Sequence, residues 1–273
     1  MIRNKKIKIG IVGVGTIGSR LAKTIVKDFK IQAQLIGICD IDKNKIKNLQ
    51  KILKNKIPIL PLENLIKKSD LIIESASTKI SYEVAKKAVL NNKDVMIMSV
   101  GGLLGKNDLF SLAKKHNIKI YIPSGAIAGI DAIKAANLVK INKVTLTTRK
   151  PPKSLAGAPY ILKRKINLNK IKKETVLFEG NALNAAKGFP QNINVAAALS
   201  FAGIGPEKTK VKIVTSPKYT KNIHEIEIAS SAGIIRTRTE NVACPENPKT
   251  SYLAVLSAIA TLKQILEPIK IGT

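Results

Sequence analysis

Tryptophan is absent from this sequence of 273 residues, other aromatic residues are few, and only two cysteines and two histidines occur. Cys39 and Cys244 lack the spacing of a zinc site and stand far from His116 and His224. We therefore expect neither a metal centre nor a disulfide framework. A chain of this length buries a large core without such cross-links. This cysteine usage is typical of a reducing compartment, so we expect a cytoplasmic protein.

Acidic residues are also scarce: 18 aspartates and glutamates stand against 47 lysines and arginines, which gives a net charge of +29. Such an excess usually suggests a nucleic-acid partner. Here the cations are mostly lysines spread along the whole chain, and the few aromatic residues offer no stacking platform for single-stranded bases. We interpret the charge as a solvated surface that attracts anionic small molecules, and we expect no nucleic-acid partner.

Long hydrophobic runs are missing too, because no stretch reaches the roughly 18 to 20 apolar residues of a membrane-spanning helix. The basic N-terminus followed by apolar residues resembles a signal peptide only superficially. Gly10, Gly13, Gly15 and Gly18 interrupt that run. We expect a first β-strand over 7–14 instead, and no association with a membrane.

The first 140 residues alternate short β-rich runs with helical segments, which predicts a parallel sheet covered by helices. The strands are expected at 7–14, 34–39, 71–74, 95–98 and 119–122, and the helices at 17–29, 43–53, 81–91 and 106–116. Beyond residue 139, longer alternating segments predict a second, mixed or antiparallel sheet with one helix. These strands are expected at 143–148, 175–180, 208–215, 223–229 and 234–240, and the helix at 192–201. A last apolar helix, 252–266, is expected to pack back on the first domain.

A glycine motif, Gly13-Val14-Gly15-Thr16-Ile17-Gly18, lies between the first expected strand and the first expected helix. In this context Gly13 permits a tight turn, Gly15 lets a pyrophosphate approach the backbone, and Gly18 lets the helix pack on the strand. The helix N-terminus at Thr16 and Ile17 offers N–H groups and a partial positive charge to the phosphates. The motif therefore predicts a Rossmann site for NAD or NADP.

Asp40 follows the second expected strand, where an acidic side chain binds the adenosine ribose hydroxyls, and this favours NAD. Asp42 competes for the same role, but Asp40 comes directly after the apolar run. Lys43 and Lys45 are able to meet the 2′-phosphate of NADP. The sequence thus predicts an α/β protein with a Rossmann domain, 1–139 plus 249–273. A second α+β domain, 140–248, is expected to bind substrate and form a dimer.

The two histidines differ in context. His116 ends a lysine-rich surface helix, where a cation is a routine structural choice. His224 lies in an alternating strand on the same face as Ile226 and Ile228. A lone histidine on an apolar face is more often a packed core residue, yet partial burial also keeps an imidazole near neutral and able to exchange protons. The residues alone leave both interpretations of His224 open.

Polar residues elsewhere in the second half suit the binding of a small anion. The segment 188–194 enters an alanine-rich helix, and its Asn192 is either a structural cap or an amide that faces a ligand. Bidentate recognition of carboxylates favours arginine. The cationic candidates on these grounds are Arg149, Lys150, Arg236 and Arg238.

Four segments in this order resemble the L-aspartate dehydrogenase family, and the resemblance runs over essentially the whole chain. They are PSGAIAGIDA at 123–132, TRKPP at 148–152, GFPQNINVA at 188–196 and NIHEI at 222–226. The resemblance implies oxidation of L-aspartate to iminoaspartate with NAD or NADP, then release of oxaloacetate and ammonia or supply of NAD biosynthesis. It further implies a homodimer with His224 as the active-site residue and with Ala126 and Asn194 at the cofactor site.

Rival functions share parts of this pattern. Dihydrodipicolinate reductase and homoserine dehydrogenase have the same two-domain plan. The first requires an H-H-x-x-K motif, and this sequence has no adjacent histidines. A basic protein that senses NADH without catalysis is the third alternative, and a steep salt dependence of DNA binding would support it.

Overall fold

The structure is a computed structural model that describes residues 5–54, 56–190 and 193–273. Its internal contacts divide the chain into two compact units, one of Met1–Pro123 with Val255–Ile271 and one of Ser124–Ala254 with Gly272–Thr273. The domain limits expected from the sequence, near residues 139 and 249, stay a prediction. Among the described residues, no helix is both long enough and apolar enough to cross a membrane.

The first unit contains a sheet of five parallel strands in the order β2-β1-β3-β4-β5. Its strands are β1 (Ile7–Val12), β2 (Ala33–Cys39), β3 (Leu71–Glu74), β4 (Asp94–Ile97) and β5 (Ile120–Tyr121). All five lie where the sequence predicted strands, and the Rossmann-type parallel sheet is confirmed. Because parallel strands end at the same edge, the segments that follow β1, β2 and β3 lie together.

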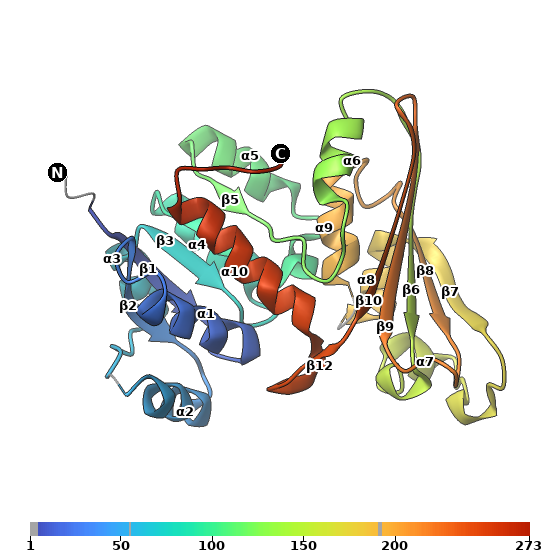
Figure 1. The fold of residues 1–273 in the computed structure, drawn as a ribbon, viewed down its shortest axis with the longest axis horizontal. Coiled ribbons are helices and arrows are strands. Elements are labelled where there is room, and N and C mark those ends of the chain that lie inside the picture. The colour runs from blue at the N-terminus through green and yellow to red at the C-terminus, as the bar shows by residue number, and fades with distance from the viewer. Residues whose placement is uncertain (1–4, 55, 191–192) are drawn as a thin grey trace. The chain divides into compact units, whose positions relative to one another are not determined.

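Six α-helices accompany this sheet. They are α1 (Thr16–Lys27), α2 (Lys43–Leu53), α3 (Leu62–Lys68), α4 (Ser81–Leu90), α5 (Asn107–His116) and the last helix, α10 (Tyr252–Leu266). The short helix α3 was not predicted, because seven residues give too few turns for a clear apolar period. Helix α10 is the red helix beside the strands of the parallel sheet in Figure 1. Its Ala258 and Leu262 are fully buried in the core formed around Ile9 and Leu21. The expected packing of the last helix is therefore confirmed.

The second unit contains a mixed sheet in the order β10-β9-β6-β8-β7, in which only β6 and β8 are parallel (Figure 1). Its strands are β6 (Ile141–Lys150), β7 (Thr175–Asn181), β8 (Lys210–Thr215), β9 (Asn222–Ser230) and β10 (Gly233–Asn241). A small hairpin of β11 (Ala243–Cys244) and β12 (Asn247–Ser251) follows. The predicted mixed sheet and the predicted turn between β9 and β10 are confirmed.

The described residues of this unit form four α-helices: α6 (Ile130–Ala136), α7 (Pro159–Lys163), α8 (Ala182–Gly188) and α9 (Asn194–Ala202). Only α9 was predicted, since the other three are five to seven residues long. The two faces of the sheet differ sharply. Val144 and Leu146 of β6 pair with Ile228 and Ile226 of β9 on a buried apolar face, and the alternate positions of these strands carry threonine and charged side chains.

Candidate active site

The glycine motif forms the turn between β1 and α1, and each glycine has its own steric reason. Gly13 has a φ of +88°, and a Cβ atom there would lie 2.5 Å from the backbone of Ala76. A Cβ atom on Gly18 would lie 2.0 Å from the carbonyl oxygen of Gly13. No atom of the described residues lies within 4 Å of the corresponding position on Gly15, so its backbone is open to a ligand.

The N-terminus of α1 completes this loop. Gly15 is the N-cap residue, so no side chain caps the first turn, which Thr16 and Ile17 begin. The Ser75 hydroxyl donates a hydrogen bond of 2.7 Å to the Gly13 carbonyl and ties the loop to the end of β3. An open glycine backbone beside a helix end without a side-chain cap fits the pyrophosphate of a dinucleotide.

Asp40 connects the end of β2 to the glycine motif. Its Oδ2 accepts a hydrogen bond of 2.7 Å from the Val14 N–H, and its Oδ1 accepts one of 2.8 Å from the Asp42 N–H. Asp42 instead caps α2, where it accepts from the N–H groups of Asn44 and Lys45. The cap explains Asp42 structurally, which leaves Asp40 as the carboxylate beside the loop.

Glu74 is a further residue of this edge that sequence reasoning missed. Its side chain is fully buried at the end of β3, and its carboxylate accepts hydrogen bonds from the N–H groups of Ala76, Ser77 and Ser99. Burial raises the pKa of this carboxyl group despite these three donors. Glu74 thereby holds the loop after β3, which contacts Gly13. The sequence signal that could have identified Glu74 is a charged residue at the end of an otherwise apolar strand.

His224 lies in β9 of the second unit, directly opposite Thr148 of β6 on one side and Thr239 of β10 on the other. Its side chain is 5% exposed, and its Nδ1 lies 3.0 Å from the Thr148 hydroxyl oxygen. Burial, followed by the nearby positive charge of Lys150, lowers the pKa of His224 to about 3. The imidazole is therefore neutral at physiological pH and held in one orientation.

Lys150 ends β6 on the same face of the sheet as Thr148 and His224. Its carbonyl oxygen accepts a hydrogen bond of 2.7 Å from the Thr215 hydroxyl of β8, which fixes the end of the strand. Desolvation lowers the pKa of the Lys150 ammonium to about 8. The structure thus brings together two of the residues singled out in the sequence, His224 and Lys150.

Ala126 lies in the loop before α6, and its carbonyl oxygen accepts two hydrogen bonds. The Thr239 hydroxyl donates one of 2.9 Å and the Asn241 side-chain amide donates one of 3.1 Å. Since Thr239 is the cross-strand neighbour of His224, the Ala126 loop is fastened beside the histidine. Asn194 begins α9 in the same unit. Asn192 lies outside the described residues.

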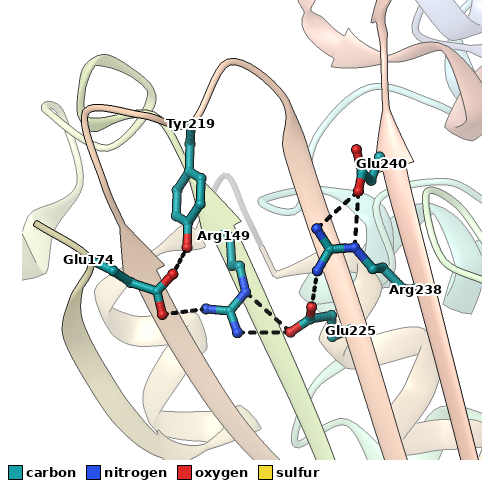
Figure 2. Close-up of polar contacts among 6 residues, drawn as sticks. All are labelled: Arg149, Glu174, Tyr219, Glu225, Arg238 and Glu240. Atoms are coloured by element: carbon teal, nitrogen blue, oxygen red, sulfur yellow. Dashed lines mark hydrogen bonds and ion pairs between the residues drawn. The ribbon is translucent and has the colours of Figure 1, made fainter.

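Arg149 lies on the opposite face of the sheet from His224, because neighbouring residues of a strand point to opposite sides. Its guanidinium group pairs with Glu225 at 2.9 Å and with Glu174 at 3.0 Å (Figure 2). Arg238 pairs with Glu225 and Glu240 (Figure 2), and Arg236 pairs with Glu227. The alternation of the strand therefore separates the arginine candidates from the histidine, and only Lys150 shares its face.

The comparisons with known proteins agree with this geometry. Residues 13–123 match the family model described as "Homoserine dehydrogenase, NAD binding domain". The parallel sheet, the glycine turn and this match define an oxidoreductase that uses NAD or NADP. Residues 131–265 match a different model, "Aspartate dehydrogenase, C-terminal", so the second unit does not support the homoserine dehydrogenase alternative.

Relatives match over the full length. L-aspartate dehydrogenase from Methanosarcina mazei is 48% identical over 271 residues, which are 98% of this chain and 100% of the relative. L-aspartate dehydrogenase from Methanococcus maripaludis is 43% identical over the same shares of both chains. The chain belongs to the L-aspartate dehydrogenase family, and the resemblance drawn from its four segments is confirmed.

Solved structures give the same result. The crystal structure of aspartate dehydrogenase from Thermotoga maritima has a TM-score of 0.76 and 27% sequence identity, and the match covers 98% of this chain and 100% of that one. A scyllo-inositol dehydrogenase from Lactobacillus casei has a TM-score of 0.56 and 16% identity, over 99% of this chain and 91% of that one. The second likeness reflects the shared fold alone.

Proposed function

We propose that this chain oxidises L-aspartate to iminoaspartate with NAD or NADP, and that His224 is its active-site residue. The observation that carries the proposal is the buried pair of His224 and Thr148 beside the Lys150 ammonium. Membership of the family supplies the substrate, and Lys150 is a polar contact for it on the same face of the sheet as His224.

The residues of the first unit bind the dinucleotide in this proposal. Gly13, Gly15 and Gly18 shape the turn, the N–H groups at Thr16 and Ile17 face the pyrophosphate, and Asp40 binds the adenosine ribose. When bound, the nicotinamide supplies the hydride acceptor. Ala126 and Asn194 of the second unit are proposed contacts to the cofactor, as the family resemblance implies.

The residues of the second unit bind and orient the substrate. The Thr148 hydroxyl fixes the His224 ring, and the neutral imidazole is able to guide the water that hydrolyses the imine to oxaloacetate and ammonia. Lys150 is the proposed substrate contact on this face. Asn192 also stays a proposed substrate contact. Arg149 forms its ion pairs on the opposite face of the sheet, which argues against a direct contact between Arg149 and the substrate.

An absorbance assay at 340 nm tests the proposed activity. We expect reduction of NAD or NADP by the purified protein with L-aspartate, and rates at least about 100-fold lower with L-glutamate or L-alanine, because an ill-fitting side chain leaves buried polar groups unpaired. Binding of NADH measured by fluorescence is the control for a competent cofactor site. NADH binding without oxidation of any amino acid would instead support the alternative of a basic protein that senses NADH without catalysis.

Asp40 is proposed to favour NAD over NADP, because its carboxylate repels the 2′-phosphate and binds the ribose hydroxyls. We expect Asp40→Asn to weaken NAD binding about tenfold, as for the loss of a charged hydrogen-bond partner, and to weaken NADP binding less. Titrations of both cofactors measure this ratio. Asp42→Asn is the matched control, since asparagine also caps helices well, and it should leave both affinities unchanged. If Asp40→Asn leaves the ratio of NAD affinity to NADP affinity unaltered, Asp40 does not select the cofactor.

A homodimer in the cytoplasm, with a role in NAD biosynthesis, is the remaining part of the proposal. The charged face of the second sheet encloses a hollow of 520 Å³ and carries cations of β6, β8 and β10 next to carboxylates of β9. A two-fold axis through this face would join two copies through the same residues of each. Sedimentation velocity would then report twice the mass of one chain. Both cysteines are free thiols, which suits a reducing compartment.

A further inference from the structure

Buried polar side chains gather at one end of the second sheet. Thr148 and Thr215 are at most 1% exposed, His224 is 5% exposed and Asn241 is 6% exposed. Further along the same face, Val144 and Leu146 of β6 and their partners on β9 are apolar. The change from apolar to polar side chains occurs within one strand, at the end where Lys150 lies.

Oxidation of an amino acid requires a group that accepts a proton from the substrate nitrogen. The substrate arrives as an ammonium, and its nitrogen must first lose a proton so that a lone pair can form the C=N bond as the hydride leaves Cα. A proton acceptor must therefore contact the nitrogen. His224 suits this step poorly, because an imidazole with a pKa of about 3 holds a proton too weakly to take it from an alkylammonium.

We propose that Lys150 is the proton acceptor for the substrate ammonium, a catalytic residue that acts beside His224. In this step an N–H bond of the substrate breaks, a new N–H bond forms on the Lys150 Nζ, and the substrate becomes a neutral amine. The hydride then leaves Cα for the cofactor, and the iminium forms with the nitrogen lone pair. The inference rests on the proposed oxidation of aspartate.

The surroundings of Lys150 support this role. Its cross-strand partner on β8 is Thr215, and Thr148 precedes it on the same face, so His224 on β9 is the titratable group that faces it from these strands. Helix α9 carries no titratable side chain, and Lys187 of α8 is exposed. Desolvation destabilises the ammonium at this buried end of the strand, and its pKa of about 8 matches a base that works near neutral pH.

Variants at Lys150 distinguish two roles of this side chain, the base that accepts a proton and a cation that binds a substrate carboxylate. In the wild type, kcat/KM for L-aspartate should rise tenfold per pH unit and level off above about 8. Lys150→Met keeps most of the aliphatic stem and should lower kcat by about 100- to 10,000-fold, the usual contribution of a general base. Lys150→Arg keeps the charge but stays protonated, so it should be similarly inactive. Lys150→Ala should recover part of its rate when ethylamine is added.

Lys143→Met is the matched control, because Lys143 lies on the same strand but on the charged face, paired with Glu227. Because this face is also the proposed dimer interface, a second control is Lys163→Met, at an exposed residue that ends α7. Lys163→Met should keep the wild-type rate and pH profile. NADH affinity and melting temperature, measured for every variant, exclude loss of fold as the cause. An active Lys150→Arg variant with an unchanged pH profile would show that Lys150 is not the base. Lys150 would then be a cation that binds a substrate carboxylate. A wild type that does not oxidise L-aspartate would overturn the proposed function itself.

Discussion

Replacing His224 by alanine is expected to lower kcat for L-aspartate oxidation by about 100-fold, the cost of misplacing the reacting groups when a side chain that positions them is lost. The reason lies in its setting, where burial keeps the imidazole neutral and the Thr148 hydroxyl fixes its ring at 3.0 Å. Affinity for NADH should stay near the wild-type value, since His224 is not among the residues proposed to hold the dinucleotide. Steady-state kinetics and a fluorescence titration measure the two quantities.

The chain supplies the control for this experiment in its second histidine. His116 ends α5 on the surface, and its Nδ1 lies 3.2 Å from the Asn92 side-chain oxygen. His116→Ala should therefore keep the full rate. Thr148→Val keeps the shape of the threonine but removes the hydroxyl, and a loss of about tenfold would show that ring orientation matters. Near-normal turnover by the His224→Ala variant would refute its catalytic role.

Two alanine substitutions in the glycine motif should weaken cofactor binding alike, but only one of them, Gly18→Ala, should also lower stability. In the part of the chain that the structure describes, the Cβ atom of Gly15→Ala meets no atom within 4 Å, so the melting temperature should stay within a few degrees. The added methyl group occupies the space that the pyrophosphate needs, and NAD affinity should fall by about 100-fold or more. Differential scanning fluorimetry and calorimetric titration measure the two effects.

Gly18→Ala serves as the contrasting variant. Its Cβ atom would lie 2.0 Å from the Gly13 carbonyl oxygen, and backbone atoms cannot move aside without distorting the turn. We expect a loss of about 1–3 kcal/mol in the free energy of unfolding, as for other overpacked sites, together with the loss of NAD binding. Equal NAD affinity in the Gly15→Ala variant and the wild type would show that the dinucleotide binds elsewhere.

The sequence by itself determined the first unit and its glycine motif. A strand, a glycine turn and a helix follow one another within 7–29, so neighbouring residues alone determine the structure of this segment. The positive φ at Gly13 favours glycine whatever packs around it. The position of Asp40 after β2 was predictable for the same reason. Short helices such as α6 and α8 were missed because seven residues show no clear period.

Tertiary structure decided which polar residues meet in the second unit. Thr148 and His224 are 76 residues apart, and only the register of β6 against β9 places them side by side. Arg149 and Lys150 are neighbours that looked equivalent as candidates, yet strand alternation turns one toward Glu225 and the other toward His224. A strand pattern shows that two faces exist, but the pairing of distant strands determines which face becomes buried and polar.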